Sequence, residues 1–192
     1  MKRYLKLILR RFLGDYEIFN IYCCASPFGS PDRPVEMVEI SADLCRQSPY
    51  PEIQDLAGYA GRDAKGFGLI DKGELVCACW YWYGEQYTLK RGFWPLEDNE
   101  AKLVQITTVE SARGKAFARN LIAASSRSME SEGFRCLFAR IWFGHTASER
   151  VFKAVGWQRI ATVLTVQAPF CGQRIRCQWP PQRLIRDRGS RV

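Results

Sequence analysis

The segment of residues 103–157 constrains the fold most, because it predicts a fixed succession of elements. Residues 103–109 are rich in β-branched side chains, as strands are. A turn at 110–112 follows, and residues 113–118 (RGKAFA) are predicted to open a helix that runs to about Glu132. A strand that leads through a glycine-bearing turn into a helix indicates an α/β fold in which the helix packs on a sheet.

One narrow face of this helix carries apolar or small side chains at helical spacing: Ala118, Leu121, Ile122, Ser125 and Met129. Gly133 stands where a helix commonly ends. A second strand is predicted over 136–143. Thr146 and Glu149 then have the spacing of a capping box, at the start of a helix that ends at Gly156.

The turn before the first helix has the composition of a pyrophosphate site. The first backbone N–H groups of a helix lack partners within it, and the helix dipole adds partial positive charge there. Gly114, Ala116 and Ala118 are small enough for an anion to approach the backbone, and Arg113 and Lys115 supply full charges. The glycine spacings of a P-loop and of a dinucleotide-binding turn are absent.

These residues resemble the acyl-CoA-binding core of the GNAT acetyltransferase superfamily, whose signature is Arg/Gln-x-x-Gly-x-Gly/Ala. The central glycine of that signature is Ala116 here. The family's later motif, an Asn followed by Ala/Ser and by Tyr-x-Lys-x-x-Gly-Phe, is matched in part by His145, Ser148, Phe152, Lys153, Gly156 and Trp157. The resemblance is strong over residues 103–157, weaker over 35–102 and absent before about residue 34.

The resemblance implies a mixed α/β (α+β) fold with a mostly antiparallel central sheet flanked by helices, and direct acetyl transfer from acetyl-CoA to an amine. The pantetheine arm is expected to pair with the backbone of residues 106–109, with a backbone N–H near Val109 polarising the thioester. The residues expected to bind the cofactor are Ile106, Thr107, Thr108, Val109, Arg113, Gly114, Lys115, Ala116, Phe117, Ala118, His145, Ser148 and Phe152.

Catalytic roles are predicted for three residues. The central strand holds no acid, so Thr107, with Gln105, could only orient a water molecule. Glu100, just before the strand, is either the general base or a solvated loop residue. His145 is a proton shuttle, a hydrogen-bond donor to CoA, or a helix-start residue. The tyrosine that often protonates the departing thiolate in the family is Phe152 here.

Charge is concentrated at the two ends of the chain. The 192 residues include 28 basic and 20 acidic side chains, a net charge of +8. Residues 1–14 carry +5 and residues 181–192 carry +3, so the middle is neutral in sum, and no nucleic-acid partner is expected. We predict an N-terminal extension (1–34), a GNAT-like domain (35–180) and a basic tail (181–192).

Residues 2–13 alternate basic and apolar side chains in helical fashion. They predict either an interfacial helix on an anionic membrane or an amphipathic helix packed on the domain. Neither a secretory signal nor a transmembrane span is expected, which predicts a cytoplasmic protein, in the first case peripheral at the inner face of the membrane.

The remaining elements are predicted from local patterns. Strands are expected over 16–22 and 35–40, helical pieces over 42–60, a β-hairpin over 66–70 and 74–83, an edge segment over 87–94, a loop over 95–100, and a closing antiparallel pair over 157–167 and 172–179. The eight cysteines lack metal-ligand or disulfide spacing and His145 is the one histidine, so buried thiols and no metal are expected.

We therefore expect an acetyl-CoA-dependent N-acetyltransferase that acts on a primary amine of a small molecule, an amino sugar being the preferred hypothesis. The aromatic run at residues 80–83 is either a stacking platform for the acceptor or part of the core. Two alternatives remain: a protein or peptide N-acetyltransferase, and a non-catalytic CoA-binding module docked on an anionic membrane.

Overall fold

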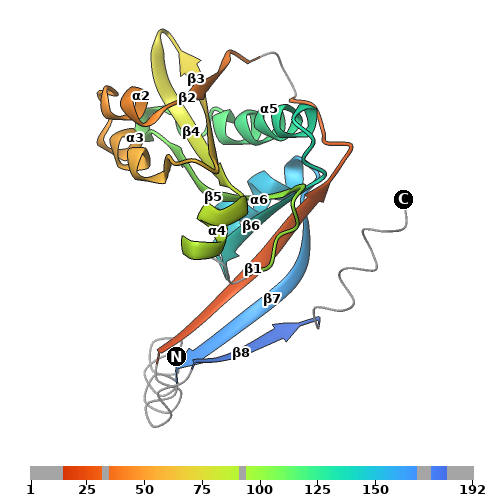
Figure 1. Cartoon of the computed structure of the whole chain (residues 1–192). Helices are drawn as coiled ribbons and strands as arrows, with labels where there is room; N and C mark the ends of the chain where they lie inside the picture. The colour runs from red at the N-terminus through yellow and green to blue at the C-terminus, as the bar shows by residue number, and fades with distance from the viewer. Residues whose placement is uncertain (1–14, 32–34, 91–93, 168–173, 181–192) are drawn as a thin grey trace. The chain divides into compact units, whose positions relative to one another are not determined.

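A computed structural model describes residues 15–31, 35–90, 94–167 and 174–180 of the chain (Figure 1). The predicted basic helix within residues 1–14 and the basic tail at 181–192 lie outside the described residues and stay predictions, as does the domain boundary at residue 34.

Eight strands form one sheet in the order β2-β3-β4-β5-β6-β1-β7-β8. The β2–β3, β3–β4, β4–β5 and β7–β8 ladders are antiparallel, and β5–β6 is parallel. This confirms the predicted fold class, a mixed and mostly antiparallel sheet with helices. The strands are β1 (Asp15–Ala25), β2 (Met37–Ile40), β3 (Ala64–Asp71), β4 (Glu74–Trp82), β5 (Glu100–Thr108), β6 (Cys136–Trp142), β7 (Gln158–Gln167) and β8 (Arg174–Trp179).

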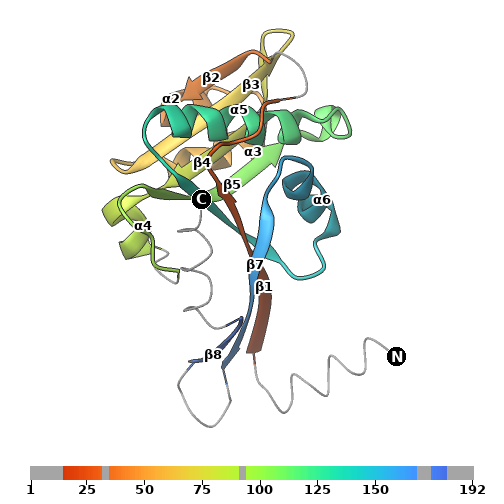
Figure 2. The ribbon, with the colours of Figure 1, turned by 90° about the vertical axis from the view of Figure 1, so that its right-hand side faces the viewer.

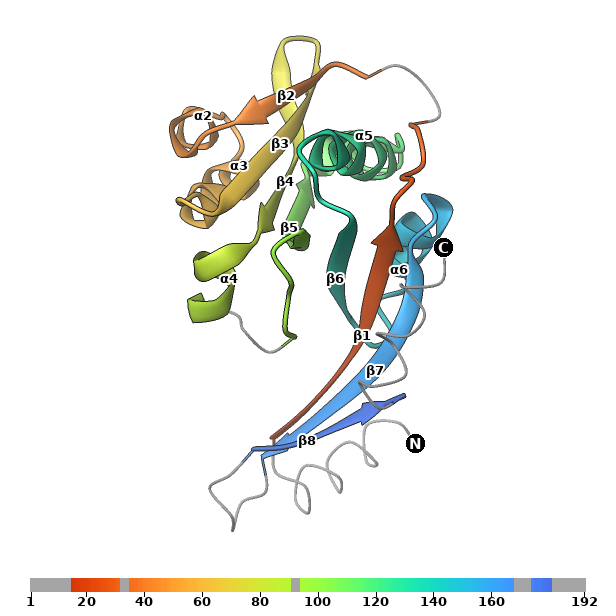
Figure 3. The same ribbon diagram turned by 45° about the vertical axis from the view of Figure 1, so that its right-hand side comes forward.

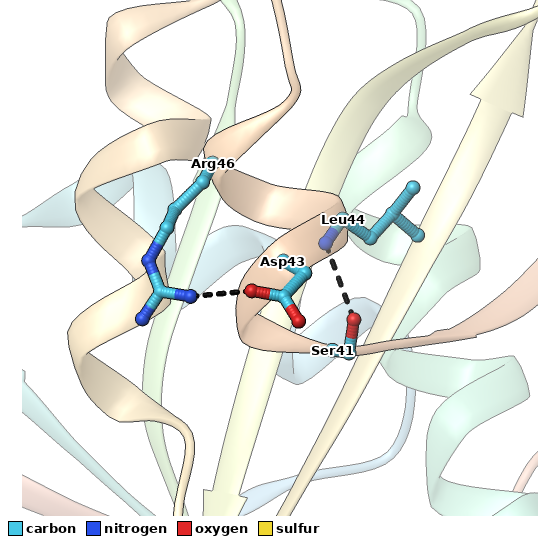
Figure 4. A network of polar contacts seen from close by, with 4 residues as sticks. All are labelled: Ser41, Asp43, Leu44 and Arg46. Carbon is cyan, nitrogen blue, oxygen red and sulfur yellow. Dashed lines mark hydrogen bonds and ion pairs between the residues drawn. The ribbon is translucent and has the colours of Figure 1, made fainter.

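The described helices are α2 (Ala42–Arg46), α3 (Pro51–Gln54), the 3₁₀ turns η1 (Asp55–Tyr59) and η2 (Glu110–Ala112), α4 (Gly84–Lys90), α5 (Phe117–Ser131) and α6 (Thr146–Ala154). Local chemistry sets their ends. The Ser41 hydroxyl, for example, accepts a hydrogen bond from the Leu44 N–H and caps α2, while Arg46 pairs with Asp43 at 2.6 Å (Figure 4).

The chain divides into two compact units. The larger unit comprises Cys23–Ala139 and Ala147–Gln158, and the smaller comprises Met1–Tyr22, Arg140–Thr146 and Arg159–Val192.

In the larger unit, α5 covers one face of β3 and β4, and α2 and α3 cover the other (Figure 3). Alternate side chains of β4 pack against the helices on the two faces of the sheet. The Tyr81 hydroxyl bonds to the Ser125 hydroxyl of α5 at 3.0 Å, whereas Trp80 packs with Ile53 and Leu56 on the opposite side. Both faces of β4 are therefore buried.

The smaller unit is a sheet of β1, the end of β6, β7 and β8, in which β7 and β8 form a hairpin (Figure 2). The Arg140 guanidinium lies over two rings, 4.8 Å from the centroid of Phe19 and 4.9 Å from that of Trp142. The Thr162 hydroxyl donates to Asn20 Oδ1 at 2.8 Å.

Three element predictions need correction. Residues 87–94 were expected as an edge segment, but α4 occupies Gly84–Lys90, because the Asp63 carboxylate accepts from the Glu85 N–H at 2.9 Å and caps this helix. The helix expected to open at residue 113 begins at Phe117. Glu100, expected in a loop, is the first residue of β5.

Candidate functional site

One edge of β5 is open along its second half. The β5–β6 ladder runs from Glu100↔Cys136 to Leu103↔Ala139 and stops there, whereas β5 continues to Thr108. On its other side β5 stays paired with β4 out to Cys77↔Thr108. Within the described residues, no strand pairs with residues 104–108 on the β6 side.

A β-bulge lies where the edge opens. Trp80 is opposite Gln105 and Tyr81 is opposite Leu103, so Val104 is the extra residue. A bulge bends its strand and increases the local twist, and bulges are common beside active sites. The bulge gives a physical reason for β5 to turn away from β6 after Leu103.

The pairing with β4 decides which amides face the open edge. The Val109 N–H donates to the Val76 carbonyl oxygen at 2.9 Å, so it is already engaged and cannot polarise a bound thioester. Because backbone direction alternates along an antiparallel ladder, the amides of Thr107 and Gln105 also point to β4, and those of Ile106 and Thr108 point to the open edge. Of the amides near Val109, only those of Thr108 and Ile106 therefore face the open edge.

The open edge leads through η2 into the turn before α5. Gly114 has φ +80° and Ala116 has φ +63° and ψ 13°, both left-handed. This conformation keeps residues 113–116 out of the helix, and so α5 starts at Phe117. A Cβ on Gly114 would meet nothing within 4 Å, so its left-handed φ, not crowding, favours glycine there.

The start of α5 has the features of an anion site. The first intrahelical bond at this end is donated by the Asn120 N–H to the Ala116 oxygen, at 3.0 Å. Ala116, at the N-cap, has no side-chain acceptor for the earlier amides, and the first turn contains no acidic residue. Arg113 and Lys115 are exposed beside these amides.

The structure places Ile106, Thr107 and Thr108 at the open edge of β5, from which the chain leads through η2 into residues 113–118. It does not bring Glu100 to them. Glu100 lies six residues before Ile106, about 20 Å along the strand, and its carboxylate accepts from the Glu97 N–H at 3.0 Å. Thr107 is half-buried and accepts from Gln105 Nε2 at 3.4 Å, which suits a role in orienting water.

The residues of the second predicted motif divide between the two units. His145 is exposed and belongs to the smaller unit, so its role at the β5 edge stays a prediction. Ser148 is half-buried on α6 in the larger unit. Phe152 is 3% exposed and packs edge-on against Trp157, with ring centroids 5.0 Å apart. It is therefore a residue of the hydrophobic core.

A polar cluster that sequence reasoning missed lies beside η2. The Tyr50 hydroxyl donates to the Glu74 carboxylate, and this bond raises the Tyr50 pKa, while a hydrogen bond with Ser111 lowers it. The three residues come from the α2–α3 connection, the start of β4 and η2. They are far apart in sequence, and no local pattern indicated that they meet. The cluster joins η2, which precedes the anion turn in the chain, to the start of β4.

The aromatic run of β4 is core. Trp80, Tyr81 and Trp82 are all at most 4% exposed, which excludes the stacking-platform interpretation for them. The Trp82 Nε1–H donates to the Tyr59 carbonyl oxygen at 2.6 Å, and Tyr83 packs edge-on against Phe134. Burial of both faces of β4 between α5 and α3 explains its aromatic content.

Within the described part of the chain, no group of three or more His, Cys, Asp or Glu side chains could hold a metal ion, and the cysteines there are free thiols. Among the same residues, no helix has the length and apolar character needed to cross a membrane.

No family model and no curated protein sequence matches the chain. Solved structures match its fold. An acetyltransferase from the GNAT family of Colwellia psychrerythraea has a TM-score of 0.58 at 14% identity, covering 86% of this chain and 61% of that one. GCN5-related N-acetyltransferases from Sphaerobacter thermophilus (TM-score 0.56, 12% identity, covering 88% and 56%) and Kribbella flavida (0.54, 13%, covering 86% and 63%) are similar.

The chain thus has the fold of the GNAT acetyltransferases, as its sequence resemblance implied. It spans 56–63% of the length of these three solved proteins.

Proposed function

We propose that this protein is an acetyl-CoA-dependent N-acetyltransferase that acts on a primary amine of a small molecule. One observation carries the proposal: the open edge of β5 runs directly into a turn with two left-handed residues and an uncapped helix start. An elongated ligand with amide groups at one end and a pyrophosphate at the other fits this succession.

Acetyl-CoA supplies the activated acetyl group and a thiolate leaving group. The amides of Ile106 and Thr108 would bond the pantetheine arm and polarise the thioester carbonyl, each donor contributing about 3 kcal/mol in the transition state. Arg113, Lys115 and the first amides of α5 would hold the pyrophosphate. The amine nitrogen then bonds to the carbonyl carbon as the C–S bond breaks.

A proton must leave the amine, and one must reach the thiolate. Gln105 and Thr107 would orient a water molecule that accepts the first proton, and the hydrogen bond between their side chains supports this role. His145 remains the proposed proton shuttle. We test it with His145→Gln, for which we expect kcat to fall about tenfold or more while the acetyl-CoA affinity is kept. Glu100→Gln tests the carboxylate, and its place at the far end of β5 predicts little change in kcat.

An amino sugar remains the preferred acceptor, supported by the basic chain ends, which suit a place near membrane-bound glycan assembly on the cytoplasmic side. A peptide acceptor is the competing enzyme proposal. A panel of amino sugars and of peptides, each with acetyl-CoA and the full chain, separates the two by which class shows turnover.

The non-catalytic alternative is favoured by two observations. Phe152 is buried against Trp157 and offers no acid, and the open part of β5 holds no carboxylate. This alternative predicts acetyl-CoA binding with no turnover on any amine of the panel.

The experiment to make first is thermal unfolding with and without acetyl-CoA. At about 100 times Kd, the ligand should add about 2.7 kcal/mol to the free energy of unfolding. Gly114→Glu puts a negative charge in the turn and should abolish the shift. Gly133→Glu is the matched control, since Gly133 also has a left-handed φ, +95°, and open space around it, but follows the other end of α5. A wild-type protein without any shift would contradict the proposal.

A further inference from the structure

We propose that the smaller unit docks on an anionic membrane surface through one apolar face of its sheet. The proposal is independent of acetyl transfer, because it rests on residues of the smaller unit alone.

Three exposed apolar side chains share this face. The Phe143 N–H donates to the Ile18 carbonyl oxygen, so Phe143 lies beside Ile18, and Ile18 is on the same face as Asn20. Asn20 bonds to the side chain of Thr162, and Thr162 is directly opposite Trp179. Ile175 precedes Trp179 by four residues on β8 and therefore shares its face.

These side chains are unusually exposed for their type: Trp179 is 76%, Phe143 62% and Ile175 52% exposed. Leu164 and Val166 of β7, opposite Cys177 and Ile175, continue the apolar surface between them and are half-buried. We call Phe143, Ile175 and Trp179 the apolar face. Across the four strands it spans about 15 Å, three strand spacings. A contiguous exposed apolar surface of this kind marks an interaction site.

The charge of the smaller unit selects the partner. Its residues include 13 basic and three acidic side chains, a net charge of +10, whereas the larger unit carries −2. The chain segments 1–14 and 181–192, which directly precede β1 and follow Pro180 in sequence, contribute +5 and +3 of this charge. Tryptophan, phenylalanine and isoleucine side chains on a unit of net positive charge suit the boundary between acyl chains and anionic headgroups.

A second copy of the chain fits this face less well. Edge-to-edge pairing of two β8 strands about a two-fold axis would bring both copies of Arg176 close together, and like charges on neighbouring strands are destabilising. A nucleic acid would use the arginines and aromatic rings but would gain little from Ile175. An anionic membrane would accommodate the positive charge of the unit, the aromatic rings and Ile175.

The test is co-sedimentation of the full chain with vesicles of about three parts phosphatidylcholine to one part phosphatidylglycerol, against vesicles of phosphatidylcholine alone. We expect binding to the anionic vesicles only, and its loss in about 0.5 M salt. A double variant, Phe143→Ser with Trp179→Ser, should lower the partition coefficient by about a hundredfold. Leu89→Ser, which changes an equally exposed apolar residue of α4 in the larger unit, should leave it unchanged.

Brominated lipids locate the contact independently of any loss of folding. They should quench part of the tryptophan emission of the wild-type protein. Trp179→Phe, which keeps the apolar character, should bind equally well and lose that quenching. Equal binding to both kinds of vesicle, binding unaffected by the double variant, or a stable dimer that shields Trp179 from quenching would each overturn the proposal.

Discussion

The Val109 N–H donates a 2.9 Å hydrogen bond to the Val76 carbonyl oxygen, and this bond sets the direction of the amides that precede it on β5. It is an internal contact of the β4–β5 pair, yet it determines what a ligand at the opposite edge can reach. With Val109 and Thr107 turned to β4, the amides that face the open edge are those of Ile106 and Thr108.

Proline substitutions on β5 should therefore have opposite effects at neighbouring positions. Ile106→Pro removes an N–H that faces the open edge, so we expect acetyl-CoA affinity to fall about tenfold, the value of one hydrogen bond, with little loss of stability. Thr107→Pro removes an N–H that bonds to β4 and should chiefly destabilise the protein. Calorimetric titration and thermal unfolding of both variants separate the effects. If Thr107→Pro were the better tolerated, the assigned amide directions would be wrong.

Ala116→Gly should stabilise the protein. A left-handed φ costs an alanine about 1–2 kcal/mol, and glycine adopts it without that cost, so we expect a gain of about 1 kcal/mol after the entropy of glycine is counted. Ala124→Gly, inside α5, is the control and should destabilise by about 1 kcal/mol. Urea unfolding measures both. A loss of stability in Ala116→Gly would show that the turn is not strained.

Alkaline pH should destabilise the protein in part through Cys77. Burial raises the pKa of the Cys77 thiol to about 12, whereas the same thiol in the unfolded chain has its ordinary pKa of 9.0. The folded-state pKa is the higher, so this stabilisation is complete below pH 9 and is lost as the pH rises toward 12.

Cys77→Ala should flatten the fall in stability above pH 9 by up to about 1.4 kcal/mol per pH unit. Cys177→Ala, at an exposed position of β8, should leave the slope as in the wild type. Urea unfolding over a series of pH values measures the slopes, and parallel profiles for Cys77→Ala and wild type would contradict the assignment.

Tyr81 should behave as a core residue and not as an acceptor contact. Tyr81→Phe removes the bond to Ser125 and should cost about 1 kcal/mol of stability, while Tyr81→Ala should cost about 3–5 kcal/mol. The acceptor KM of Tyr81→Phe should equal that of the wild type. An increase in KM without a loss of stability would restore a role in binding the acceptor.

Much of the fold could be predicted because its signals are local. The β-branched run of β5, the alternation in β1 and the turn of the β3–β4 hairpin each depend on neighbours in sequence, and each is confirmed. The helix α4 was missed because its cap, Asp63, is supplied by a residue more than 20 positions earlier. The place of β1 between β6 and β7 likewise depends on tertiary contacts.

The residues of the candidate site could be predicted from sequence, but the conformation of its turn and the direction of its backbone amides could not. Arg113, Gly114 and Ala116 identified the anion turn from sequence, but the pattern cannot show that two of these residues are left-handed and delay the helix to Phe117. Whether an amide on β5 faces a strand or an open edge depends on register, which a bulge at Val104 shifts. The Tyr50–Glu74 contact has no sequence signal at all.

The early end of the β5–β6 ladder has a consequence for the state of the backbone. A bound acyl-CoA arm would occupy the place of a missing strand, so that the ligand itself completes the hydrogen-bond ladder along residues 104–108. The amides of Ile106 and Thr108 would then exchange with deuterium quickly in the free protein and slowly in the complex, while Thr107, held by β4, would be protected in both.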